Sequence, residues 1–134
     1  MDRLIVELVQ LASLWTGYAI PESLPPLERP APSAMPCSCL GFYAYGRKTV
    51  AYGAVANATD RLLLRSDIDV DAPMGRSILF HELVHALQAA RGPAATGSSE
   101  WQRRERQAYA LQYRYLATLR EDAPWMSTAM GKDD

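Results

Sequence analysis

The first part of the chain changes its pattern of hydrophobic and polar residues twice. Over residues 3–15, apolar side chains recur at the spacing of one helix face, and Gly17 follows, which predicts an amphipathic helix ending at the glycine. Six of the nine prolines then fall within 21–36. Because proline neither continues a helix nor fits a central strand, this segment is expected to be an extended strap on the domain surface. The apolar face of the helix comprises Leu4, Leu8, Leu11 and Trp15.

Residues 40–66 have the composition of β-strands. Aromatic, β-branched and other apolar residues form three runs, at 42–45, 49–56 and 61–65, with turn-like stretches between them. Such runs predict a small, mainly antiparallel sheet of three strands joined by hairpins. The last run can be either a core strand or the edge strand of this sheet.

A long helix is predicted over residues 73–90. Its residues are apolar nearly all round, which is typical of a buried helix, and the sequence Arg91-Gly92-Pro93 ends it. Asp71 offers a carboxylate to cap its start, and Pro73 fits the first turn.

A second long helix is predicted to begin near Ser99, where Ser99 and Gln102 match a capping box, and to continue to about Leu119. Arg103, Arg104, Arg106 and Gln107 fall on its outward side. The inward stripe comprises Trp101, Glu105, Ala108, Gln112, Tyr115 and Leu119.

These elements together predict one α+β domain over residues 1–134. Its expected parts are an N-terminal helix (1–20), a proline-rich strap (21–39), a sheet (40–66), two antiparallel helices (73–120) and a tail (121–134). The chain has 134 residues, 49% of them hydrophobic, so it is long enough to bury a core.

Charge and termini bear on partners and location. The net charge is −1 and no basic face is evident, so no nucleic-acid partner is expected. The N-terminal segment carries Asp2 and Glu7 within its apolar pattern. It therefore does not resemble a secretory signal or a membrane span, and a cytoplasmic location without membrane contact is expected.

Two groups of potential metal ligands, a pair of cysteines and three alternating aspartates, are not expected to bind metal. Cys37 and Cys39 would close a very small loop if bridged, so free thiols are expected. The alternating Asp67, Asp69 and Asp71 do not form an EF-hand calcium loop. In that pattern a glycine and a bidentate glutamate would stand where this chain has Ala72 and Ile78.

The sequence His81-Glu82-Leu83-Val84-His85 matches H-E-x-x-H, the zinc-binding helix of metalloproteases. Residues four apart project from one face of a helix, so both imidazoles can reach one metal ion. Glu82 is then placed to act as general base on a water at the metal. The chain has two histidines and both lie in this motif, within a predicted buried helix where unpaired polar groups would be costly.

A third protein ligand must come from elsewhere in the chain. The extended motif with a third histidine fails, because Gln88 and Arg91 occupy its places. Glu105 lies on the inward stripe of the second helix, about as far from the interhelical loop as His85, so antiparallel packing would bring the two level. Pairing with an arginine is the alternative role for Glu105, and Glu100 is a weaker candidate ligand.

His81, Glu82, His85 and the later Glu105-x-x-Ala108 resemble the gluzincin arrangement of the zincin metallopeptidases, over about residues 61–116. The chain is also similar to small bacterial zincin-like proteins that consist of little more than this core. The resemblance implies that His81, His85 and Glu105 bind one zinc ion, that Glu82 is the general base, and that Ala108 permits close helix packing. Tyr109 stands where many gluzincins have an aspartate. It is therefore expected either to orient His81 or to stabilise an oxyanion.

The expected function is that of a zinc-dependent peptidase acting on a peptide or protein substrate. The resemblance also implies that the run 61–65 aligns this substrate by strand addition if it is the edge strand. The alternative is an inactive zincin-like binding module in which zinc joins the two helices. A third possibility is a domain whose partner docks on the proline strap. The same ligands also accept cobalt or manganese.

Overall fold

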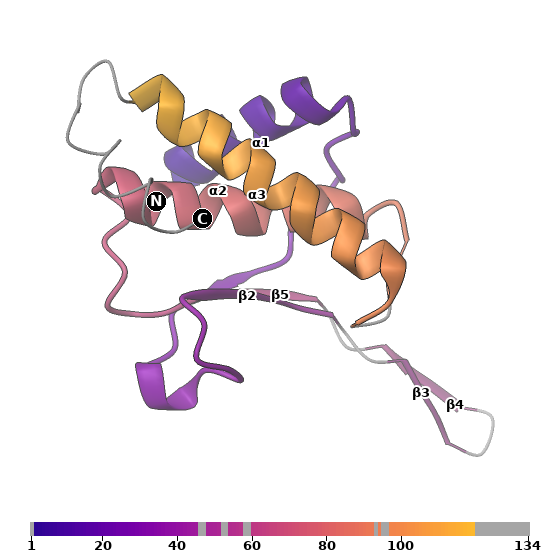
Figure 1. The fold of residues 1–134 in the computed structure, drawn as a ribbon. Helices are drawn as coiled ribbons and strands as arrows, with labels where there is room; N and C mark the ends of the chain where they lie inside the picture. Colours follow the sequence, from indigo (N-terminus) through magenta and orange to yellow (C-terminus); the bar gives the residue numbers. More distant parts are fainter. Residues whose placement is uncertain are drawn as a thin grey trace.

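The structure is a computed structural model that describes residues 2–45, 48–51, 54–57, 60–92, 94 and 97–119. Within these residues the chain has an α+β fold, which confirms the predicted class (Figure 1). The predicted tail, 121–134, lies outside the described residues. In the described part, no helix combines the length and apolar composition that a membrane crossing requires.

The three-stranded sheet has the order β1-β5-β2. Strand β1 (Leu27–Glu28) runs parallel to β5 (Arg61–Leu64), and β2 (Gly41–Ala44) runs antiparallel to β5 on its other side. The sheet is therefore mixed, and the segment predicted to be an extended strap supplies β1 at one end of the strand order. Strands β3 (Lys48–Ala51) and β4 (Ala54–Asn57) form a separate antiparallel pair, so the expected single hairpin-linked sheet is wrong.

The position of β5 resolves the two interpretations of residues 61–65. Strand β5 has a partner on each side, so it is the core strand of the sheet. Strand β2 pairs with β5 on one side and, among the described residues, with no strand on the other. Leu62, Leu63 and Leu64 are all buried, which agrees with the central position of β5.

Arg29 attaches the proline-rich segment to the end of β5. Its guanidinium donates hydrogen bonds to the backbone carbonyls of Leu64 (3.0 Å), Arg65 (3.3 Å), Ser66 (3.3 Å) and Ile68. The backbone N–H of Ser66 also donates to the carbonyl of Pro30, at 2.8 Å. After these contacts the segment forms a short 3₁₀ turn, η1 (Pro32–Ala34).

Helix α2 (Pro73–Ala89) packs on the sheet, α1 (Asp2–Thr16) and α3 (Ser99–Leu119) pack on α2, and α2 contributes the largest share of the buried hydrophobic residues. Helix α2 thus contacts α1, α3, β2 and β5 (Figure 1). Because it is covered on so many sides, α2 is buried at every residue from Ser77 to Gln88. This burial explains why its sequence is apolar nearly all round.

The two long helices begin where the sequence predicted, but with different caps. Ala72 precedes α2 without a side-chain cap, and Asp69 Oδ1 accepts the N–H of the exposed Asp71 instead. The loop lies so close that a Cβ on Gly75 would stand 1.9 Å from the carbonyl oxygen of Asp69. At α3 the capping hydroxyl belongs to Ser98, which accepts the N–H of Trp101 at 3.1 Å, rather than to Ser99.

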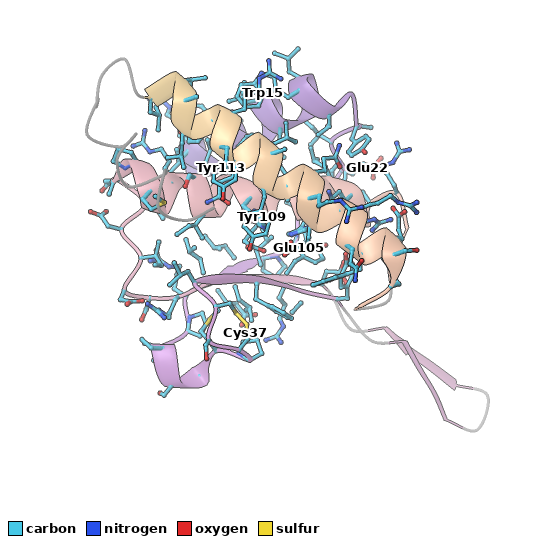
Figure 2. All side chains as sticks on the ribbon, in the orientation of Figure 1. Trp15, Glu22, Cys37, Glu105, Tyr109 and Tyr113 are labelled. Atoms are coloured by element: carbon cyan, nitrogen blue, oxygen red, sulfur yellow. A yellow bond between two sulfur atoms is a disulfide. The ribbon has the colours of Figure 1, made fainter. Side chains whose placement is uncertain are left out.

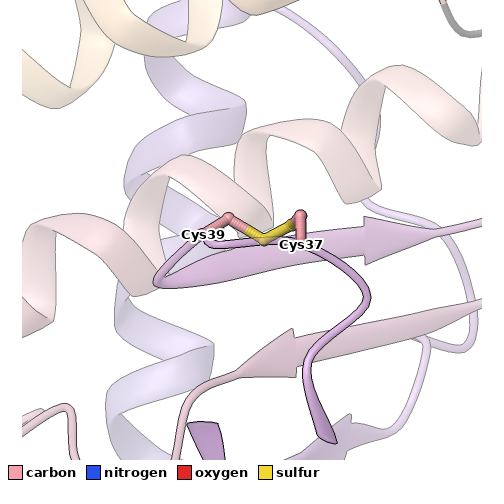
Figure 3. Close-up of a disulfide and its surroundings, with 2 residues drawn as sticks. All are labelled: Cys37 and Cys39. Atoms are coloured by element: carbon pink, nitrogen blue, oxygen red, sulfur yellow. A yellow bond between two sulfur atoms is a disulfide. The ribbon is translucent and has the colours of Figure 1, made fainter. Parts of the chain in front are cut away.

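Cys37 and Cys39 form a disulfide, so the expectation of free thiols is wrong (Figure 3). Their Cα atoms are 5.1 Å apart, which lies within the range that disulfides bridge. Because disulfides persist mainly in oxidising compartments, this bridge does not support the cytoplasmic location, which stays a prediction.

Candidate metal centre

His81 and His85 lie one turn apart on the same face of α2. Both residues are buried, with 6% and 8% of their surface exposed. Their Nε2 atoms are 3.1 Å apart. The i, i+4 spacing within one helix produces this convergence without help from other elements.

Glu105 reaches the two histidines from α3. Its Oε1 lies 3.1 Å from His81 Nε2 and also contacts His85 Nε2. The two helices run antiparallel, because contacts pair Gln88 with Arg104 and Ser77 with Gln112. The structure therefore places Glu105 level with His85, as the sequence predicted.

The structure favours neither of the alternatives, which were an arginine partner for Glu105 and Glu100 as the third ligand. The ion pairs of Glu105 are with the two histidines rather than with an arginine. Glu100 lies at the surface and pairs with Arg103 and Arg104. Ala108 is fully buried, consistent with close contact between α2 and α3.

The three side chains fit a metal ion. The ligand atoms of His81, His85 and Glu105 all lie within 4.8 Å of one another. Two ligand atoms bound to one tetrahedral zinc ion stand about 3.3 Å apart, close to the 3.1 Å between the imidazole nitrogens. Two imidazoles and a carboxylate are ligands that zinc shares with other transition metals, so the three side chains lie close enough to bind a metal ion but do not identify the metal.

The charges of the three groups influence one another strongly. Burial would raise the pKa of Glu105, but hydrogen bonds from His81 and His85 and their charges outweigh it and lower the pKa to about 2. Burial would lower the pKa of His85, yet the hydrogen bond to Glu105 and the charges of Glu82 and Glu105 raise it above its usual value. Glu105 is therefore held as a carboxylate that favours a cation beside it.

Glu82 lies beside the histidines, and 5% of its surface is exposed. Within the described part of the chain, one of its carboxylate oxygens, Oε1, has no hydrogen-bond partner. Burial raises the pKa of Glu82 despite the opposing charges of His81 and His85. A buried carboxyl group that lacks a partner and has a raised pKa is a candidate proton acceptor.

Tyr109 stands one turn after Glu105 on the side of α3 that faces β2 (Figure 2). Its ring centroid is 4.5 Å from that of His81, and 49% of its surface is exposed. His81 Nδ1 has no hydrogen-bond partner, so the expected role of Tyr109 in orienting His81 by a hydrogen bond is wrong. The oxyanion role stays a prediction.

A cavity of about 1050 Å³ opens beside the three ligands. Its walls come from the proline-rich segment, β2, α2 and α3, and include Cys37, Gly41, Tyr43, Glu82, Trp101 and Tyr109. Tyr43 of β2 belongs both to the cavity wall and to the hydrophobic core. It lines the cavity, is buried, and donates its hydroxyl proton to Asp60 Oδ2 at 2.7 Å.

Sequence reasoning missed two residues at this site. Gln88 is 2% exposed, and its Oε1 lies 2.7 Å from His85 Nδ1. Its position three residues after His85 was the signal that could have identified it, since residues three apart share a helix face. Gly41 of β2 lies so close to Glu82 that an added Cβ would stand 2.9 Å from its Oε2, and no pattern within the strand indicates that neighbour.

No family model, no curated protein and no solved structure matches this chain. Any function proposed for the protein therefore depends on the geometry and chemistry of the metal centre itself.

Proposed function

We propose that this protein is a zinc-dependent peptidase that hydrolyses peptide bonds. The proposal depends on the environment of Glu82, whose carboxyl group is buried and has one oxygen without a hydrogen-bond partner among the described residues. Glu82 stands next to three metal-ligand side chains and lines the same cavity. A purely structural metal site needs its ligands but no such neighbouring base.

The roles of the residues follow from their positions. His81, His85 and Glu105 would hold the ion. A bound zinc ion supplies a Lewis acid that lowers the pKa of water and polarises a carbonyl group. Glu82 would take a proton from the attacking water and pass it to the departing amide nitrogen, so that a carboxylic acid and an amine are released. Tyr109, exposed at the cavity, would donate a hydrogen bond to the oxyanion.

Strand β2 provides the place for an extended substrate. The backbone N–H of Arg65 donates to the carbonyl of Leu40, and residues along an antiparallel pair alternate between bonded and unbonded positions. Gly41 and Tyr43 therefore direct their backbone groups away from β5. A peptide added at this edge would use backbone hydrogen bonds, which favours broad sequence specificity.

The test replaces Glu82 by Gln, which keeps the size of the side chain but removes the base. We expect stoichiometric zinc by elemental analysis and a loss of about 10²–10⁴-fold in peptide hydrolysis, the usual contribution of a general base. Glu100→Gln, which alters a surface carboxylate outside the site, serves as the matched control and should retain both zinc and activity.

Assays of the wild-type protein distinguish the peptidase from the alternative, an inactive binding module. If zinc is present in the wild-type protein but no peptide in a broad mixture is cut, the ion has a structural role between α2 and α3. Full activity in Glu82→Gln would remove Glu82 from the mechanism.

A further inference from the structure

Gln88 has hydrogen-bond partners that determine the orientation of its amide group. The Nε2 atom lies 2.9 Å from the backbone carbonyl oxygen of Arg104 and 2.9 Å from Oε1 of Gln107. A carbonyl oxygen accepts hydrogen bonds and cannot donate them. The atom of Gln88 that faces Arg104 must therefore be the amide nitrogen, which leaves Oε1 facing His85.

This orientation in turn determines which nitrogen of His85 carries a proton. Oε1 of Gln88 is 2.7 Å from His85 Nδ1, and an amide oxygen can only accept. His85 Nδ1 must therefore be the donor. In a neutral imidazole the other nitrogen, Nε2, then has a free lone pair, and this is the atom that faces Glu105 and His81.

We propose that Gln88 is a positioning residue that holds His85 in the tautomer and ring orientation required to bind the metal through Nε2. This inference rests on the metal centre of the proposed function, but not on peptidase activity. Partners of this kind raise the affinity of a site because the ligand needs no reorientation on binding.

The support for Gln88 extends to the N-terminal part of the chain. Gln107, predicted to face outward, accepts hydrogen bonds at Oε1 from both Gln88 Nε2 and the hydroxyl of Tyr18 (3.2 Å). Tyr18 lies two residues after the end of α1, and the guanidinium of Arg91 lies 4.4 Å from the centre of its ring. The segment after α1 thus contributes to the position of a metal ligand that it does not touch.

The test compares Gln88→Met with Gln112→Met. Methionine keeps the length of the side chain and removes the acceptor. Gln112 is a matched control because it is also buried between α2 and α3 but bonds Ser77 rather than a histidine. We expect Gln88→Met to weaken zinc binding, measured by competition with a chelator, roughly 10- to 100-fold, and Gln112→Met to change it little.

Nuclear magnetic resonance provides a readout that does not depend on activity. The chain has two histidines, so long-range ¹H–¹⁵N spectra of their rings contain few signals. We expect a protonated Nδ1 on His85 in the zinc-loaded and the metal-free protein, with its proton protected from exchange, and loss of that protection in Gln88→Met.

The outcomes separate this inference from the proposed function. Unchanged zinc affinity in Gln88→Met, or an unprotonated Nδ1 on His85 in the wild type, would overturn the role of Gln88. Weakened affinity in a protein that cuts no peptide would support Gln88 and reject the peptidase. If Gln88→Met does not fold, Gln88→Glu is the second variant. It retains an acceptor for His85 and should keep zinc affinity closer to the wild type, and a loss as large as 100-fold in a folded Gln88→Glu protein would also count against the proposal.

Discussion

Gly41, which has no side chain, limits the space available to the candidate base Glu82. A Cβ added to Gly41 would lie 2.9 Å from Glu82 Oε2 and 3.0 Å from its Cγ. Both distances are shorter than ordinary contacts, so something must move. The carboxylate is the free end of a flexible side chain, and it would move more readily than the β2 backbone.

Gly41→Ala is therefore expected to displace Glu82 while leaving the fold intact. Zinc content should stay stoichiometric, and hydrolysis should fall by about 10²-fold, the effect of a misplacement of about 1 Å in a catalytic group. Activity assays and elemental analysis on the same sample test this.

A double-variant cycle controls the interpretation. Adding Gly41→Ala to Glu82→Gln should cause little further loss, because the glycine acts through the carboxylate. Independent, additive losses would show that Gly41 affects the reaction by another route.

At the scale of elements, the proline-rich segment belongs to the sheet and to the cavity. It supplies β1, and residues after β1 line the cavity beside the ligands. Arg29 joins it to four backbone carbonyls at the end of β5 and just beyond. A positively charged donor shared among several carbonyls makes a stronger contribution than a neutral hydrogen bond.

Arg29→Ala is expected to lower the free energy of unfolding by about 2 kcal/mol, the usual loss for a hydrogen-bonded charge that is partly buried. Denaturant titration of the metal-free protein measures it. Arg61→Ala is the control, because Arg61 and its partner Glu28 have side chains 50% and 45% exposed. Such a surface pair contributes about 0–1 kcal/mol. Equal losses in the two variants would contradict the role given to Arg29.

For the whole molecule, the titratable groups of the candidate metal centre couple folding to pH. The pKa of His85 is raised, so its protonation stabilises the metal-free fold at low pH, and this contribution is lost as pH rises through the raised value. The pKa of Glu82 is also raised, so ionising it costs stability as pH rises above its usual pKa. The pKa of Glu105 is lowered to about 2, so its contribution is present above its usual pKa and is lost as pH falls through about 2.

The metal-free protein is therefore expected to become less stable as pH rises above the ordinary histidine pKa of about 6.5, because folded His85 loses its proton only above that value. Zinc should reverse this trend, because its ligands bind without protons and its affinity rises with pH. Thermal unfolding with chelator and with excess zinc, at increasing pH, measures both trends. A zinc-induced rise in Tm that shrinks as pH increases would contradict the assignment of histidine ligands.

The sequence by itself determined the two long helices and the residues that converge between them. Helical spacing is local, so the positions of His81 and His85 were predictable from four residues of separation. Glu105 was predictable because a charged residue on a buried stripe needs a partner, and helix lengths placed it level with His85.

Only the tertiary structure decided which groups surround these ligands. Strand pairing joins distant segments, so the alternating pattern could not show that 27–28 would flank β5 or that β2 would be left at the edge. The contact of Gly41 with Glu82 and the chain from Tyr18 through Gln107 and Gln88 to His85 also join separate elements. Their cause is the packing of α1, α2, α3 and the sheet around one core, and no periodicity within a single segment records it.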